Sequence, residues 1–171
     1  NKKKKNKERS SQYEFYIKYE RPEEYAKDPN EFYVAKRVNE YSQSKALMRI
    51  QEKITKRALE IAKIEPPARI LDLGMGCGFA STHMFLNRFQ VVGIDLNLLF
   101  LSYYEIQHLN PIQSDMRDKG FRHGSFDLII SISAIQWILA EKNESKRVKH
   151  LKKIADQCNL ILKPKGKIIF Q

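Results

Sequence analysis

The sequence predicts an α/β fold in which helices cover both faces of an open, mostly parallel sheet. Three observations predict this fold. Short apolar runs alternate with helical segments from about residue 65 onward, and a glycine-rich loop follows the first of these runs. The run at 126–133 (FDLIISIS) lacks charged residues after its first two positions, as expected of a strand that is buried on both faces.

The first part of the chain is predicted to be a tail followed by a leader. Residues 1–11 (NKKKKNKERSS) are polar and mostly basic, which predicts a disordered tail. Residues 12–64 are predicted to be a helical leader whose aromatic side chains pack on the core. The leader ends in a helix at 43–64. Five apolar residues of this helix have the spacing of one inward face: Leu47, Ile50, Ile54, Ala58 and Ile61.

Residues 65–171 are predicted to form the α/β core. The predicted strands are 69–73, 90–95, 111–114, 126–133 and 167–171. The predicted helices are 81–88, 98–107 and 143–162, with a turn at 163–166 before the last strand. The last helix has four inward positions: Leu151, Ile154, Cys158, and Ile161 or Leu162. Because the sequence stops inside an apparent strand, we expect the core to lack its C-terminal strands.

The glycine loop after the first strand reads Asp-Leu-Gly-Met-Gly-Cys-Gly from Asp72 to Gly78. Glycines at this position let the backbone turn tightly and approach a ligand closely. Dinucleotide-binding loops place their third glycine three residues after the second, whereas here the interval is two. The D-x-G-x-G-x-G pattern resembles motif I of class I S-adenosylmethionine-dependent methyltransferases, which implies their Rossmann-like fold.

This resemblance implies further cofactor-binding residues at the next strand ends. Asp95 ends the second strand, where a carboxylate accepts both ribose hydroxyls, and Leu96 is expected to lie near the adenine. Asp115 follows the third strand and is expected to receive the adenine amino group, with the Met116 N–H serving a ring nitrogen. The complete expected set for S-adenosyl-L-methionine is Asp72, Gly74, Gly76, Gly78, Asp95, Leu96, Asp115, Met116 and Ser131.

A narrower resemblance involves the segment 124–137 (GSFDLIISISAIQW). It is similar to the fourth-strand motif of the small-subunit (18S) rRNA guanine-N7 methyltransferases of ribosome biogenesis, and parts of residues 21–60 resemble the leader of that family. Guanine N7 loses no proton on methylation, so no catalytic acid or base is expected, only positioning. The candidate substrate-side residues are Ser133, Gln136 and Trp137. Trp137 could stack on a flipped base or belong to the core.

Composition and the resemblance together indicate the partners. The net charge of +11 favours a polyanion, and the resemblance specifies ribosomal RNA of the pre-ribosomal small subunit. It also implies a small zinc-binding activator protein at the edge strand 111–114, beside Phe100, Leu101, Tyr103, Tyr104 and Ile106. With only two cysteines and no apolar run of membrane length, we expect no metal site and no membrane span. The expected location is the nucleus and cytoplasm.

Two other functions remain open at this point. The chain could be a class I methyltransferase of tRNA, protein or a small molecule. It could also be a non-catalytic assembly factor of pre-ribosomes that keeps the fold for docking. Binding of the cofactor separates the enzymes from the assembly factor.

Overall fold

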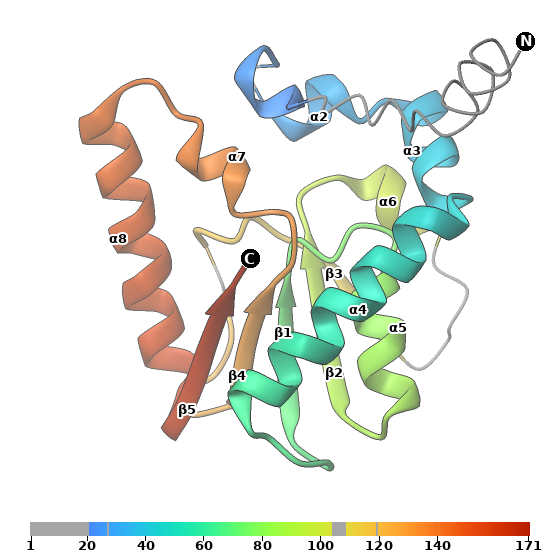
Figure 1. Cartoon of the computed structure of the whole chain (residues 1–171). Coiled ribbons are helices and arrows are strands. Elements are labelled where there is room, and N and C mark those ends of the chain that lie inside the picture. Colours follow the sequence, from blue (N-terminus) through green and yellow to red (C-terminus); the bar gives the residue numbers. More distant parts are fainter. Residues whose placement is uncertain (1–20, 27, 104–108, 119) are drawn as a thin grey trace, which may run out of the picture.

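The sheet has five strands in the order β3-β2-β1-β4-β5, and all of its described pairings are parallel (Figure 1). This computed structural model describes residues 21–26, 28–103, 109–118 and 120–171. The predicted tail at 1–11 and the start of the leader lie outside the described residues. The strands are β1 (Arg69–Leu73), β2 (Gln90–Asp95), β3 (Asn110–Gln113), β4 (Phe126–Ser131) and β5 (Leu162–Phe170).

The direction of chain progression reverses between β1 and β4. From β1 the chain moves outward through β2 to β3, then returns across the sheet to β4 and proceeds to β5 on the other side. The segments that follow β1 and β4 therefore lead to helices on opposite faces of the sheet. In an open parallel sheet, such a reversal leaves a crevice at the carboxyl ends of the strands.

Helices cover both faces of the sheet, as predicted. α4 (Lys45–Ala62) and α5 (Phe79–Leu86) contribute Ala58, Ala62, Ala80 and Met84 to the core cluster on one face. The opposite face is covered by α8 (Glu144–Ile161), which buries Ile154, Cys158 and Ile161. The predicted inward positions of this helix are thus confirmed at its C-terminal half, while Leu151 is only partly buried.

The leader consists of short helical elements before α4. They are the 3₁₀ turn η1 (Pro22–Glu24), α2 (Pro29–Phe32) and α3 (Ala35–Ser42). Asp28 caps α2 by accepting hydrogen bonds from the backbone N–H groups of Asn30 and Glu31. Ser44 likewise caps α4 at the N–H of Leu47. These caps satisfy backbone donors that no helical carbonyl reaches.

The predicted inward face of α4 was partly wrong. Ile50 and Ile61 are 52% and 59% exposed, whereas Gln51 and Thr55 are buried. Both buried polar side chains have hydrogen-bond partners: the Thr55 hydroxyl donates to the backbone carbonyl of Gln51 at 2.7 Å, and the Gln51 side-chain amide donates to the Tyr41 hydroxyl at 3.5 Å. The leader packs beside α4, so the buried face of this helix is set by tertiary contacts that the apolar spacing does not reveal.

The boundaries of several other elements differ from the prediction. α5 lies at Phe79–Leu86 instead of 81–88, and β3 lies at Asn110–Gln113 instead of 111–114. β4 ends at Ser131, and the residues expected as its last part lead instead into the unpredicted one-turn helix α7 (Gln136–Leu139). β5 begins at Leu162 rather than 167, with an irregularity in its pairing to β4 at the predicted turn. α6 (Leu98–Ser102) is described for only part of the predicted helix 98–107. None of the helices in the described ranges has the length and apolar character that crossing a membrane requires.

Candidate functional site

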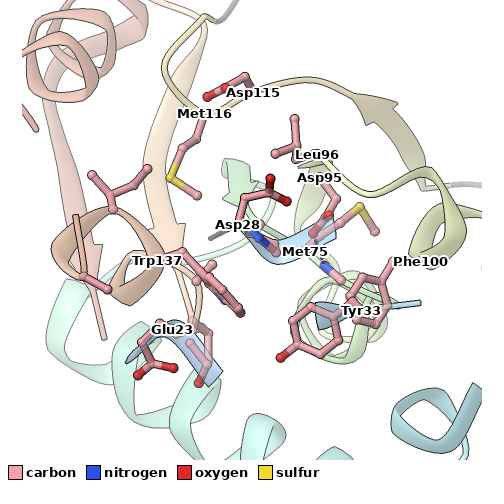
Figure 2. Close-up of a pocket in the computed structure, with 18 of the residues that line it drawn as sticks. Glu23, Asp28, Tyr33, Met75, Asp95, Leu96, Phe100, Asp115, Met116 and Trp137 are labelled. Atoms are coloured by element: carbon pink, nitrogen blue, oxygen red, sulfur yellow. Dashed lines mark hydrogen bonds between the residues drawn. The ribbon is translucent and has the colours of Figure 1, made fainter. Parts of the chain in front are cut away.

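A cavity of about 510 Å³ lies at the carboxyl ends of the strands, between the strand-end loops and the leader (Figure 2). Most of the predicted site residues line it. They are Asp72, Gly74, Gly76, Asp95, Leu96, Asp115, Met116, Ser133 and Trp137. The other predicted residues, Gly78, Ser131 and Gln136, are outside its lining.

The glycine loop after β1 forms one wall of this cavity. Gly74 and Gly76 both have positive φ, 75° and 55°, which side chains other than glycine rarely adopt. The Gly74 N–H donates to the Ile94 carbonyl at 2.8 Å and thereby holds the loop against β2. A Cβ at Gly76 would meet no atom within 4 Å, so it would occupy open space beside the cavity. The loop is therefore shaped for the close approach of a ligand to bare backbone.

Gly78 and Ser131 support this wall from outside the cavity. Gly78 precedes α5 with a φ of 86°, and its N–H donates to the Met75 carbonyl at 2.9 Å. The fully buried Ser131 donates its hydroxyl to the Leu73 carbonyl at 2.8 Å and so ties the end of β4 to the end of β1. Both residues therefore stabilise the loop after β1 without lining the cavity.

Asp72 is a buried carboxylate at the end of β1, only 1% exposed. Burial raises its pKa to about 6, against the lowering effect of the Ser81 hydroxyl, which donates to Oδ2 at 2.6 Å. The neighbouring Asp95 carboxylate raises the pKa further. Among the described residues no basic side chain is hydrogen-bonded to Asp72, so a cationic ligand group in the cavity would find a favourable partner here.

Asp95 is held by two backbone N–H groups. Gly76 donates to its Oδ2 and Asn97 donates to its Oδ1, both at 2.8 Å. Each carboxylate oxygen therefore keeps capacity to accept one more hydrogen bond. Burial raises the pKa of this carboxyl group, whereas the backbone N–H groups of Asn97, Gly76 and Leu96 act to lower it. Such a fixed pair of acceptors is suited to a vicinal diol.

Asp115 has a partner that the sequence did not reveal. The Arg117 guanidinium donates to both of its carboxylate oxygens, with Nε–Oδ1 at 2.9 Å and Nη2–Oδ2 at 2.5 Å. Burial acts to raise the pKa of Asp115, but the hydrogen bonds from Arg117 hold it below its ordinary value. Met116 lines the cavity beside it, and no described residue accepts a hydrogen bond from the Met116 N–H. That N–H is available to a ligand.

The segment between β4 and α7 forms the opposite wall. Ser133 has a φ of 56°, and its N–H donates to the Gln171 carbonyl at 3.0 Å. The Gln136 side chain donates to the Ser133 carbonyl at 2.8 Å, so it braces this turn instead of facing the cavity. Trp137 is half-buried and lines the cavity, where the structure places it beside the leader and not in the core beneath a helix.

Residues of the leader complete the site, and the sequence reasoning missed them. The ring of Tyr33 lies 6.0 Å from that of Trp137 and 4.9 Å from that of Phe100, between centroids. Tyr41 stacks on Phe79 at 5.8 Å. These contacts pack the leader over the loops after β1, β2 and β4, and Figure 2 shows Tyr33, Phe100 and Trp137 among them. Their abundance predicted packing on the core, but no spacing in the sequence relates them to a cavity.

Phe100 also corrects the predicted partner-binding patch. It is 5% exposed and lines the cavity, so it does not belong to an outer surface. Tyr103 is 39% exposed and Leu101 is half-buried. Tyr104 and Ile106 lie outside the described residues.

Comparison with known proteins relates this geometry to a family. A family model described as a methyltransferase domain matches residues 71–170. The Schizosaccharomyces pombe protein named 18S rRNA (guanine-N(7))-methyltransferase bud23 is 35% identical over 158 residues, which are 88% of this chain and 58% of that protein. The 18S rRNA (guanine(1575)-N(7))-methyltransferase of Saccharomyces cerevisiae is 34% identical, over 88% of this chain and 56% of that protein. The chain thus spans somewhat more than half the length of these relatives.

Solved structures share the fold at lower identity. A TehB-like SAM-dependent methyltransferase from Corynebacterium glutamicum superposes with a TM-score of 0.62, at 19% identity, over 80% of this chain and 73% of that one. The SAM-bound amino pentose methyltransferase CalS10 from Micromonospora echinaspora gives a TM-score of 0.56, at 17% identity, over 81% of this chain and 56% of that one. The predicted Rossmann-like class I methyltransferase fold is confirmed.

Proposed function

The chain belongs to the methyltransferase domain family, and on that basis we propose that it transfers a methyl group from S-adenosylmethionine to N7 of a guanosine in small-subunit ribosomal RNA. One observation carries the proposal: a single cavity joins three strand-end carboxylates to Trp137, an aromatic side chain suited to stack on a base. The names of the two yeast relatives support guanine N7 of 18S rRNA as the acceptor.

The carboxylates of the cavity fit the parts of S-adenosylmethionine. Asp72 is positioned for the ammonium of the methionine part, and the two free acceptor positions of Asp95 match the ribose hydroxyls. The free Met116 N–H fits an adenine ring nitrogen, and Asp115 is positioned for the amino group while Arg117 keeps it ionised. When bound, the cofactor supplies a sulfonium methyl group that a nucleophile can attack.

Acidification is expected to weaken cofactor binding through Asp72. The ionised carboxylate attracts the cationic ligand, and its pKa of about 6 means that this form is lost as the pH falls through 6. Below that value the dissociation constant should rise by up to about tenfold per pH unit, which is the limit for one linked proton. Calorimetric titrations between pH 5 and 8 measure it.

Asp72→Asn is the control for this pH dependence. The amide still accepts from Ser81 but carries no charge, so its affinity should be low at pH 8 and should vary less with pH. An unchanged pH profile in this variant would show that another group titrates.

Positioning accounts for the chemistry of the transfer. Guanine N7 carries a free lone pair and releases no proton, so the protein needs only to align N7 with the methyl group. Trp137 stacks the base, and the Ser133 turn, braced by Gln136, forms the wall beneath it. The packing of Tyr33 on Trp137 limits the rotamers of the indole and keeps it in place.

A basic surface beside the cavity supports RNA as the substrate. Seven basic side chains occur between positions 142 and 153: Lys142, Lys146, Arg147, Lys149, His150, Lys152 and Lys153. Lys142 and His150 line the cavity, and the others continue along the N-terminal half of α8. Cations at a helix N-terminus oppose the helix dipole, so this arrangement favours a role in binding phosphates over one in stability.

Methylation of defined RNA tests the proposed function. The full-length protein is incubated with unmethylated small-subunit rRNA and labelled S-adenosylmethionine, and N7-methylguanosine is mapped by chemical cleavage and primer extension. We expect a single modified guanosine. Label in tRNA, protein or small molecules but not in rRNA would favour the second enzyme function, and a protein that does not bind the cofactor would favour an assembly factor.

We also propose that a small zinc-binding activator protein pairs with the outer edge of β3. Among the described strands only β2 pairs with β3, so its other edge is open to strand addition. Four exposed apolar side chains lie on or near this edge: Leu98, Leu99, Tyr103 and Ile112. Burial of such a patch by a partner is physically favourable.

Charge at this edge is expected to prevent assembly with the activator. Ile112 is 40% exposed, and Ile112→Lys would bury an ammonium group in the interface, weakening the complex about tenfold or more. Co-expression with the activator followed by light scattering measures complex formation. Leu86→Lys, at a 70% exposed position on α5, is the matched control and should leave assembly intact. Equal assembly in both variants would place the partner elsewhere.

The proposed substrate indicates where the protein acts. Pre-ribosomal small subunits are assembled in the nucleus and mature in the cytoplasm of eukaryotic cells, and the named relatives of this chain are eukaryotic proteins. We therefore propose a nuclear and cytoplasmic location, which fluorescence microscopy of the tagged full-length protein tests.

A further inference from the structure

Among the residues that the structure describes, one carboxylate in the cavity has no hydrogen-bond donor. Seven acidic side chains line the cavity: Glu23, Glu24, Asp28, Asp72, Asp95, Asp115 and Glu141. Asp72, Asp95 and Asp115 accept from Ser81, from two backbone N–H groups and from Arg117, respectively. The remaining acids except Glu23 are also engaged, since Glu24 pairs with Arg21, Asp28 caps α2 and Glu141 accepts from the Asn143 N–H. For Glu23, no described residue donates a hydrogen bond.

The position of Glu23 relates it to the base-binding side of the cavity. It lies on η1, in the leader, and is half-buried. Tyr33 packs on Trp137 and is close enough to Glu23 for the two to interact electrostatically. Burial raises the pKa of Tyr33 to about 12, and the negative charge of Glu23 contributes in the same direction. In Figure 2, Glu23 and Trp137 lie toward one end of the view, whereas Leu96, Asp115 and Met116 lie toward the other.

Guanine presents the chemistry that such a carboxylate recognises. Its N1–H and its exocyclic N2 amino group lie on one edge and point the same way, so the two oxygens of one carboxylate can accept both. Adenine has an acceptor at N1 and cannot make this pair. N7 lies on the opposite side of the purine, so a guanine that turns N7 toward the strand-end carboxylates turns its N1–N2 edge toward the leader.

We propose that Glu23 reads the N1–H and N2 amino edge of the guanine that Trp137 stacks. This inference rests on the proposed function and assigns guanine selectivity to a residue outside the sheet. A neutral amide at this position would present its own N–H groups to guanine donors, so the recognition requires the carboxylate.

The same carboxylate would also stabilise the methylated base. In the transfer, the N7 lone pair forms the new N–C bond, and the sulfur–carbon bond breaks with its electron pair remaining on sulfur. The sulfur becomes neutral and the purine becomes cationic, with no proton lost. A carboxylate at the N1–N2 edge attracts the purine more strongly as the purine becomes cationic than when it is neutral guanine. Glu23 is therefore expected to affect kcat as well as KM.

Glu23→Gln tests the assignment, with Glu40→Gln as the control, at an exposed position on α3 of the leader outside the cavity lining. Glu23→Gln should keep its affinity for S-adenosylmethionine within about twofold while its methylation rate on small-subunit rRNA falls about tenfold to hundredfold, as for loss of hydrogen bonds to a charged group. The wild type should bind GMP more tightly than IMP, which lacks the N2 amino group, and Glu23→Gln should lose this preference. Nuclear magnetic resonance titrations in the presence of S-adenosylhomocysteine measure it.

The outcomes separate this assignment from the proposed function. If Glu23→Gln methylates rRNA and prefers GMP to IMP as the wild type does, Glu23 does not read the base. If Glu40→Gln loses as much activity, the effect arises from the leader as a whole and the assignment is wrong. If the wild type binds the cofactor but methylates no rRNA guanosine, the proposed function fails, and the GMP and IMP titrations still decide whether Glu23 recognises guanine.

Discussion

Replacing Asp95 with alanine is expected to abolish measurable binding of S-adenosylmethionine, with a loss in affinity of about a hundredfold or more. The variant lacks the two acceptors that fit the ribose hydroxyls, and hydrogen bonds to a charged group contribute roughly 1.5–3 kcal/mol each. It also leaves the N–H groups of Gly76 and Asn97 without their acceptor, which loosens the glycine loop. Isothermal titration calorimetry with the purified protein measures the affinity.

Asp127→Ala is the matched control for this experiment. Asp127 is a partly exposed carboxylate at the start of β4, at the end of the sheet away from the cavity, where it accepts from the Arg69 N–H and pairs with Lys163 at 2.8 Å. Its loss should leave cofactor affinity unchanged. Wild-type affinity in Asp95→Ala would contradict the assignment of the cavity to the cofactor, whereas equal losses in both variants would indicate general unfolding.

Gly74→Ala is expected to destabilise the fold by about 2–5 kcal/mol and to impair the cavity at the same time. Its φ of 75° costs an L-residue roughly 1–2 kcal/mol. The added Cβ would also lie 2.3 Å from the Cβ of Ala134, which is fixed to the backbone and has no rotamer to adopt. The loops after β1 and β4 would have to separate, an overpacking that costs about 1–3 kcal/mol. Denaturant unfolding monitored by circular dichroism measures the change.

Substitutions at two other glycines separate the cost of the backbone conformation from the cost of the contact with Ala134. Gly124 has a similar φ of 62° with no atom within 4 Å of an added Cβ, so Gly124→Ala measures the cost of the backbone conformation alone. Gly76→Ala should lower stability by about as much as Gly124→Ala, because its Cβ also meets no atom within 4 Å. This Cβ would occupy space that the ligand needs, so cofactor affinity should fall. If Gly74→Ala were as stable as Gly124→Ala, the close contact with Ala134 would be relieved without cost.

Two of the parallel strands, β1 and β2, were predictable to the residue. β1 and β2 begin and end at the predicted positions, because a strand covered on both faces reads as a short apolar run bounded by polar residues. β4 was predicted two residues too long. Ile132 and Ile135 are apolar and buried although neither is in the strand, so hydrophobicity alone could not separate the strand from the turn that leads to α7.

The sequence alone determines where the strand-end carboxylates lie, whereas only the tertiary structure shows which residues of the leader complete the cavity. In a parallel sheet, successive strands end at the same edge, so the sequence alone determined that Asp72, Asp95 and the segment around Asp115 would lie at one edge, where they line one cavity. Only the tertiary structure decided that Arg117 engages Asp115, and that Tyr33 and Glu23 line the cavity on the same side as Trp137. The leader and the strand ends are far apart along the chain, so their contacts depend on how whole elements pack. The local spacing of residues does not predict such packing.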